Sequence, residues 1–281
     1  MRARELIDFI KLEHTVFDLP FIYAGAIIAS GGSYHILKYI IILITATSAR
    51  GAGMSINRIL GLRYDRINPR KKDWALVKGS MKIKTAYLFT AILIAVFELS
   101  TYLLNDVVFY LSPIVIMFFI ADPLLKRVTA WRHLFMGFTI GLGVLGGFLA
   151  ITPVFPPLII YITVLISTFW IAGFDIIYTI PDIDYDRKNN LKTFNVRFGL
   201  RKGMTISYIF HIFTIMLFIF IAFLVKNVYY DFLLIPIIGL IIYEHIIVNP
   251  SNIRTIRMSF FNANSFIGII FLIGMIISFY R

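Results

Sequence analysis

Cysteine is absent from the 281 residues, and charged residues make up only 15% of them. The first absence excludes disulfide frameworks, thiolate metal sites and cysteine nucleophiles. The second excludes an ordinary water-exposed surface, because soluble domains carry about 25% charged residues. Hydrophobic residues account for 59% of the chain instead. Most of the surface is therefore expected to face lipid.

Apolar runs recur along the whole chain, and each approaches the length of about 20 residues that crosses a bilayer. Gly31-Gly32, Asn105-Asp106 and Asn249-Pro250 mark some of the breaks between them. A backbone in lipid must satisfy its own hydrogen bonds, so the spans are helices. We predict an all-α polytopic membrane protein that forms a single domain over residues 1–281. Its nine predicted spans are 15–31, 36–56, 84–104, 107–125, 133–151, 157–179, 203–224, 230–248 and 258–279.

The formal net charge of +12 has two explanations, a nucleic-acid partner or basic cytoplasmic loops. With nine spans and the N-terminus inside, only Lys38, Lys226 and Arg281 of the 27 basic residues lie on the outer side. This asymmetry predicts an integral cell-membrane protein with a cytoplasmic N-terminus and cytoplasmic polar loops. It accounts for most of the charge without nucleic acid.

Two polar segments, 50–84 and 175–202, are about half the chain apart and hint at a duplicated four-helix unit plus one extra helix. The second segment carries four aspartates. Asp182 and Asp186 share one face if the segment is helical, and Asp175 lies seven residues earlier, close to the same direction. Carboxylates so arranged repel each other unless a cation lies between them. Hard oxygen ligands in ones and twos suit Mg2+.

Solvated charges at a helix end are the alternative explanation of this cluster. Basic residues follow it directly, among them Lys192 and Arg197, so groups for a metal and groups for phosphate are adjacent. The first polar segment offers a weaker counterpart, in which Asn57 and Asp65 are eight residues apart with Gly61 midway. Most of its basic residues are expected to be positive-inside charges, and one or two to be diphosphate contacts.

Residues 174–186 read F-D-I-I-Y-T-I-P-D-I-D-Y-D, and residues 57–65 read N-R-I-L-G-L-R-Y-D. In these motifs the chain resembles the UbiA superfamily of intramembrane prenyltransferases. The second motif matches the family pattern in full, whereas Gly61 stands where the first motif of the family has an aspartate. Further stretches look most like the 4-hydroxybenzoate and menaquinone-type branch: 11–21, 68–70, 126–129 with His133, 170–175, 196–199, and Phe260-Phe261 with Asn264.

The resemblance implies nine helices around a central cavity, and transfer of a polyprenyl group from its diphosphate to an aromatic acceptor such as 4-hydroxybenzoate. Mg2+ would be held by Asn57, Asp65, Asp175, Asp182 and Asp186. Tyr178 would steady the carbocation, or would only pack between helices. The candidate contacts to diphosphate or acceptor are Arg58, Lys126, Arg127, Lys192, Arg197 and Asn264. Membrane lipid would surround the isoprenoid tail.

Gly61 leaves alternatives open. The protein could hold a single Mg2+, use Asp184 or water instead of the missing carboxylate, or keep the fold without catalysis as a lipid-binding or complex subunit. Alkylation of a non-aromatic lipid acceptor is a variant of the enzyme hypothesis. A transporter is disfavoured, because transporters carry charged sites near mid-membrane and these charges collect at the span ends.

Overall fold

The computed structural model describes residues 3–280, and every regular element in that range is helical. Nine helices of the described chain are long and apolar enough to cross a membrane. The predicted all-α, nine-span class is thus confirmed. Arg281, used above in counting charges, lies outside the described residues.

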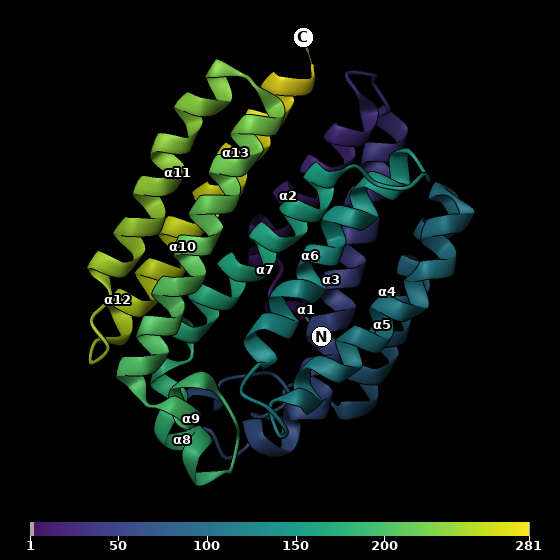
Figure 1. Ribbon diagram of the computed structural model, residues 1–281. Coiled ribbons are helices and arrows are strands. Elements are labelled where there is room, and N and C mark those ends of the chain that lie inside the picture. Colours follow the sequence, from purple (N-terminus) through teal and green to yellow (C-terminus); the bar gives the residue numbers. More distant parts are fainter. Residues whose placement is uncertain (1–2, 281) are drawn as a thin grey trace.

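The nine spans form a bundle, and the short helices α8 and α9 lie at one end of it (Figure 1). The helices are α1 Ala3–Ile10, α2 Thr15–Ser30, α3 Ile36–Asp65, α4 Ile83–Leu104, α5 Asp106–Leu125, α6 Arg132–Ile151, α7 Leu158–Tyr178, α8 Ile183–Lys188, α9 Phe194–Phe198, α10 Leu200–Val225, α11 Val228–Ile247, α12 Ile253–Met258 and α13 Asn264–Phe279.

Two predicted bounds differ from the structure. The second span was expected to end at residue 56, whereas α3 continues to Asp65. The stretch from Asn57 to Asp65 is therefore helix and not the start of a polar loop. The last span is interrupted, because a π-helical turn at Ser259–Ala263 separates α12 from α13.

Local chemistry explains where several helices end. Gly31 and Gly32 have φ angles of 53° and 92°, which only glycine adopts without strain, and they terminate α2. Asn105 caps α5 by accepting a hydrogen bond from the Val108 amide at 3.1 Å. Asn227 caps α11 in the same way through the Tyr229 amide at 2.9 Å.

Helix α7 is the most enclosed span, with 78% of its window buried against 11% for α5. It packs between α6 and α10, and α2 packs on α6. Glycines make the close approaches possible, because a Cβ at Gly137 would collide with the Thr168 carbonyl and one at Gly147 with the Ile22 carbonyl. The core of the bundle is thus built on α2, α6 and α7.

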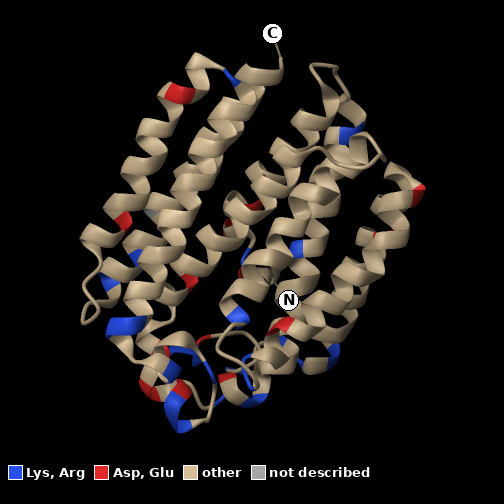
Figure 2. Cartoon of the chain, in the orientation of Figure 1, with Lys and Arg blue, Asp and Glu red and all other residues tan. Residues whose placement is uncertain are grey.

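Charged residues gather at one end of the bundle, around α8, α9 and the segment that joins α3 to α4 (Figure 2). Few charges lie at the opposite end. This distribution agrees with the predicted asymmetry, while the assignment of the charged end to the cytoplasm stays a prediction.

Candidate active site

A cavity of about 800 Å³ runs between α2, α3, α4, α5, α6 and α7 and reaches the charged end of the bundle. Its wall towards the other end is apolar and includes Ile42, Leu104, Val108 and Leu149. Its charged end is lined by residues from both polar segments, namely Asp65, Arg70, Lys71, Asp175 and Asp182. The cavity therefore joins an apolar groove to a polar chamber.

The first polar segment turns back over the cavity after Asp65, the last residue of α3. Asn68 accepts a hydrogen bond from the Arg70 amide at 3.0 Å and starts a short 3-10 turn at Pro69–Lys71. The turn directs Lys71 Nζ to Asp65 Oδ1 at 2.7 Å. Local backbone geometry thus places a cation beside the first aspartate.

The same turn contacts the second polar segment. Asn68 Nδ2 donates to Asp182 Oδ1 at 3.2 Å, and Arg70 Nη1 lies 2.7 Å from Asp182 Oδ2. Two segments more than 100 residues apart in sequence therefore meet at one carboxylate. This contact lies at the charged end of the cavity.

The expected single helical stripe of Asp175, Asp182 and Asp186 is wrong. Helix α7 ends at Tyr178, a 3-10 turn covers Ile180–Asp182, and α8 starts only at Ile183. Pro181 lies in that turn and cannot continue an α-helix, because it lacks an amide donor. Asp175 and Asp182 line the cavity, whereas Asp186 does not.

Asp186 is completely buried next to the chamber, with Lys126 Nζ 2.9 Å from its Oδ1. Its other oxygen, Oδ2, accepts no hydrogen bond among the described residues. Burial raises the pKa of Asp186, and the nearby Lys126 charge opposes that rise. A buried carboxylate oxygen without a donor can serve as a ligand to a cation.

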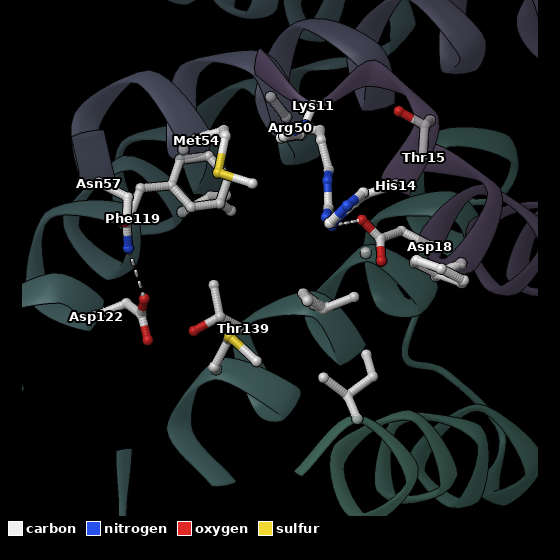
Figure 3. Close-up of a pocket in the computed structure, with 18 of the residues that line it drawn as sticks. Lys11, His14, Thr15, Asp18, Arg50, Met54, Asn57, Phe119, Asp122 and Thr139 are labelled. Atoms are coloured by element: carbon white, nitrogen blue, oxygen red, sulfur yellow. Dashed lines mark hydrogen bonds and ion pairs between the residues drawn. The ribbon is translucent and has the colours of Figure 1, made fainter. Parts of the chain in front are cut away.

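Asp175 belongs to a second group of charges on the cavity wall. His133 Nδ1 lies 2.7 Å from Asp175 Oδ2, and Arg132 Nη1 lies 3.4 Å from the same oxygen. Arg132 also pairs with Asp122, with Nη2 to Oδ2 at 3.0 Å. Asn57 Nδ2 is turned towards Asp122 Oδ2 at 3.5 Å, as Figure 3 shows.

Sequence reasoning missed Asp122 and Arg132 as site residues, because both lie at the ends of apolar spans. The available signal was their charge, since an ionisable residue in a membrane span is a functional candidate by default. The same holds for Arg50, which pairs with Asp18 on the cavity wall between α3 and α2 (Figure 3).

Arg58 lies in the cavity wall and is 4% exposed. Its guanidinium carbon is 4.0 Å from the centre of the Trp74 ring and 5.5 Å from that of Phe9. Arg127 also lines the cavity, donating to the Leu60 carbonyl at 3.2 Å. Both arginines are thus held by contacts to neighbouring elements.

The remaining candidates divide into two sets. Tyr178 lines the cavity and its ring centre is 4.4 Å from that of Phe260. Lys192 and Arg197 are exposed and do not line it. Asn264 does not line it either, and is completely buried between helices. The structure therefore brings together most of the predicted site residues, but not these last three.

Gly61 lines the cavity one helical turn before Asp65. A Cβ there would lie 3.5 Å from Asp65 Oδ2, which is ordinary van der Waals contact. The position therefore has room for a side chain, and its glycine is not required by packing.

The carboxylate and amide oxygens of this chamber are of the class that Mg2+ prefers. Within residues 3–280, no three acidic or histidine side chains converge into a ready-made metal site. Mg2+ commonly uses one or two carboxylates, together with water and the phosphate oxygens of a substrate. Asp65, Asp175, Asp182 and the Oδ2 atom of Asp186 fit that pattern.

Known proteins are similar to this chain in sequence. A model of the UbiA prenyltransferase family matches residues 19–266. The chain is 31% identical over 159 residues to 4-hydroxybenzoate geranyltransferase 1 of Lithospermum erythrorhizon, in a match that spans 57% of this chain and about half, 52%, of the plant protein.

Solved structures share the fold. The apo structure of a UbiA homologue from Aeropyrum pernix K1 superposes with a TM-score of 0.85 at 30% identity, covering 95% of this chain and 98% of that one. A UbiA homologue from Archaeoglobus fulgidus bound to GPP and Mg2+ superposes with a TM-score of 0.74 at 17% identity, covering 99% and 100%. The resemblance and the fold expected from the motifs are confirmed.

Proposed function

The chain belongs to the UbiA prenyltransferase family, and from that premise we propose that it transfers a polyprenyl group from an isoprenoid diphosphate to an aromatic acceptor, with Mg2+ as cofactor. One observation carries the proposal. Asn68 and Arg70 of the first polar segment reach Asp182 of the second, at the charged end of a cavity whose other end is apolar. Such a chamber suits a metal diphosphate, and the groove suits its isoprenoid tail.

The carboxylates hold the metal in this proposal. Asp65 and Asp182 face the chamber from its two sides, and Asp175 is held in place by His133 and Arg132. Bound Mg2+ supplies positive charge to the leaving diphosphate. Asp186, whose Oδ2 has no donor among the described residues, completes the acidic set from beside the chamber.

The basic residues contribute the rest of the electrostatic stabilisation. Arg70 is paired with Asp182, and Lys71 is paired with Asp65. Both cations therefore lie where a diphosphate would be bound if Mg2+ linked it to these two aspartates. Positive groups fixed beforehand stabilise charge that develops during reaction. The allylic C–O bond then breaks with its electron pair going to the diphosphate. A ring carbon of the acceptor forms the new C–C bond and loses its proton.

The acceptor is proposed to be 4-hydroxybenzoate or a related quinone precursor. The relatives named above support that class, and the cavity offers a cation separate from the Arg70 and Lys71 pairs. Arg50, which is paired with Asp18 on the cavity wall in Figure 3, is suited to an acceptor carboxylate. The N-terminus and the charged end are proposed to be cytoplasmic.

The test uses purified protein in detergent with Mg2+, geranylgeranyl diphosphate and a panel of acceptors. The panel contains 4-hydroxybenzoate, a naphthoate, and a glycerol-phosphate lipid precursor. We expect prenylated 4-hydroxybenzoate or naphthoate, and no product from Asp182→Ala. Product from the glycerol-phosphate alone would replace the acceptor assignment, and absence of product with every acceptor would contradict the enzyme proposal.

A further inference from the structure

A hydrogen-bonded network lies inside the bundle, behind one wall of the cavity. Glu244 of α11 is completely buried, and its Oε1 accepts from Ser259 Oγ at 3.3 Å and from Asn264 Nδ2 at 3.2 Å. Asn264 Oδ1 accepts from Trp170 Nε1 of α7 at 2.7 Å. An ionisable side chain within a membrane span is costly, so its retention points to a role.

The network spans the π-helical turn Ser259–Ala263. Ser259 is the first residue of the turn, Asn264 directly follows it, and Asn264 Nδ2 also lies 3.4 Å from the Ser259 carbonyl. Turns of this kind are rare and occur often at functional sites. Here two side-chain donors and one carboxylate hold both ends of the turn.

The turn presents two consecutive aromatic residues to the cavity. Phe260 and Phe261 both line it, together with Phe17, Phe174 and Tyr178, and we refer to these five as the aromatic wall. The Phe260 ring centre lies 4.4 Å from Tyr178, 5.1 Å from Phe17 and 5.3 Å from Phe174. The position of Phe260 therefore affects the whole wall.

The network also holds α7 directly before Phe174. The His211 ring lies against Gly173, where any Cβ would collide with it. His211 Nε2 is 3.2 Å from the Trp170 carbonyl, and its Nδ1 is 2.8 Å from His245 Nε2. The part of α7 that carries Phe174 and the π-helical turn that carries Phe260 and Phe261 are thus both held by contacts from behind the aromatic wall.

We propose that Glu244 and Asn264 are positioning residues that hold the π-helical turn, so that Phe260 and Phe261 face the allylic cation. The inference rests on the proposed function. Aromatic faces attract cations, and the attraction is stronger in a water-free site. The cation has two fates: an acceptor carbon can bond to it and lose a proton, or water can add to it, giving a prenyl alcohol and a proton. If the aromatic wall is displaced, water can reach the cation. The ratio of prenyl alcohol to prenylated acceptor therefore reports the position of the aromatic wall.

The first test compares Asn264→Ala and Glu244→Leu with Glu244→Gln, whose amide oxygen can accept the same hydrogen bonds. We expect kcat to fall about 10-fold or more in the first two, since small displacements at a reacting centre have effects of that size. KM for geranylgeranyl diphosphate should change less than about threefold, because the diphosphate contacts remain. The fraction of prenyl alcohol should rise, and Glu244→Gln should restore both values.

Thr163→Val is the matched control. Thr163 is equally buried in α7, and its hydroxyl donates only to the Ile159 carbonyl of its own helix, at 2.7 Å. It should leave the product ratio unchanged. A folded Asn264→Ala protein with the wild-type ratio and kcat would overturn the proposal, and so would a Thr163→Val protein with the Asn264→Ala phenotype.

A double-mutant cycle with Phe260→Leu separates this inference from the proposed function. If Asn264 acts through Phe260, the losses in the double variant are smaller than the product of the single losses. Should the wild-type protein transfer no prenyl group at all, the proposed function fails. The same cycle in thermal unfolding then decides whether the network holds the turn: Tm shifts that simply add would overturn it.

Discussion

Lys126 Nζ lies 2.9 Å from Oδ1 of Asp186, although Lys126 follows α5 and Asp186 belongs to α8. The carboxylate is buried, and its Oδ2 accepts no hydrogen bond among the described residues. Removing one partner of such a pair leaves an uncompensated charge, which is costly. The stability of the folded protein is therefore expected to depend on the protonation of Asp186.

Because burial raises the pKa of Asp186 above its ordinary value of 3.8, the unfolded chain loses this proton at lower pH than the folded one. The contribution to stability is therefore full below the ordinary pKa and decreases as pH rises through the raised one. We expect Asp186→Asn to flatten the acidic part of the Tm-against-pH profile. Asp184→Asn, whose side chain is 90% exposed, should leave the profile unchanged.

Asp182 is the carboxylate at which the two polar segments meet. Asp182→Ala removes the partner of Asn68 and Arg70, and with it a proposed metal ligand. We expect kcat/KM to fall about 100-fold or more, the size of a lost preorganised electrostatic contact. Asp184→Ala, two residues away and exposed, is the control. Equal activity of the two variants would refute the role of Asp182.

Gly61 has room for a side chain beside Asp65. Gly61→Asp would add a carboxylate to this side of the chamber, so we expect the Mg2+ concentration for half-maximal activity to fall. Gly61→Ala supplies the same Cβ without charge and should leave that concentration near the wild-type value. Mn2+ binding measured by electron paramagnetic resonance checks the result without turnover. Unchanged Mn2+ affinity in Gly61→Asp would show that this position does not reach the metal.

Gly146 and Gly147 are adjacent in α6 but differ in their surroundings: Gly147 packs against α2, whereas Gly146 has open space beside it. A Cβ at Gly147 would collide with the Ile22 carbonyl, whereas one at Gly146 meets nothing within 4 Å. Gly147→Ala should lower the free energy of unfolding by about 1–3 kcal/mol, the usual cost of overpacking. Gly146→Ala should not destabilise the protein. Thermal unfolding in detergent distinguishes the two, and equal Tm values would contradict the α2–α6 packing.

The absence of cysteine makes the orientation directly testable. Ser33→Cys and Asp184→Cys would each introduce a single thiol at an exposed position near opposite ends of the bundle. A membrane-impermeant thiol reagent added to whole cells should label Ser33→Cys and not Asp184→Cys. The reverse pattern would place the charged end outside the cell.

The sequence predicted the spans well because apolar length is a one-dimensional property. The prediction from sequence was wrong where a polar segment is helical. The stretch from Asn57 to Asp65 was interpreted as loop, yet it is helix whose polar face lines a cavity. Average hydropathy cannot distinguish a face turned to a cavity from a segment turned to water.

Site residues were predicted best where a motif fixed their spacing. Asp175 and Asp182 line the cavity from one continuous stretch of sequence. The pairing of Arg132 with Asp122 depends on how α5 and α6 pack, which no local pattern records. Asn264 was singled out by its place beside Phe260-Phe261 in the sequence. Its contacts to Glu244 and Trp170 could be seen only in the structure.

Measuring both products of one reaction tests whether the protein is a Mg2+-dependent prenyltransferase. Purified protein, Mg2+, geranylgeranyl diphosphate and 4-hydroxybenzoate are incubated, and diphosphate and prenylated 4-hydroxybenzoate are measured together. We predict equal amounts of the two, both abolished by removing Mg2+ and by Asp182→Ala. Diphosphate release that persists in Asp182→Ala, or no release from the wild-type protein with any acceptor, would contradict the account.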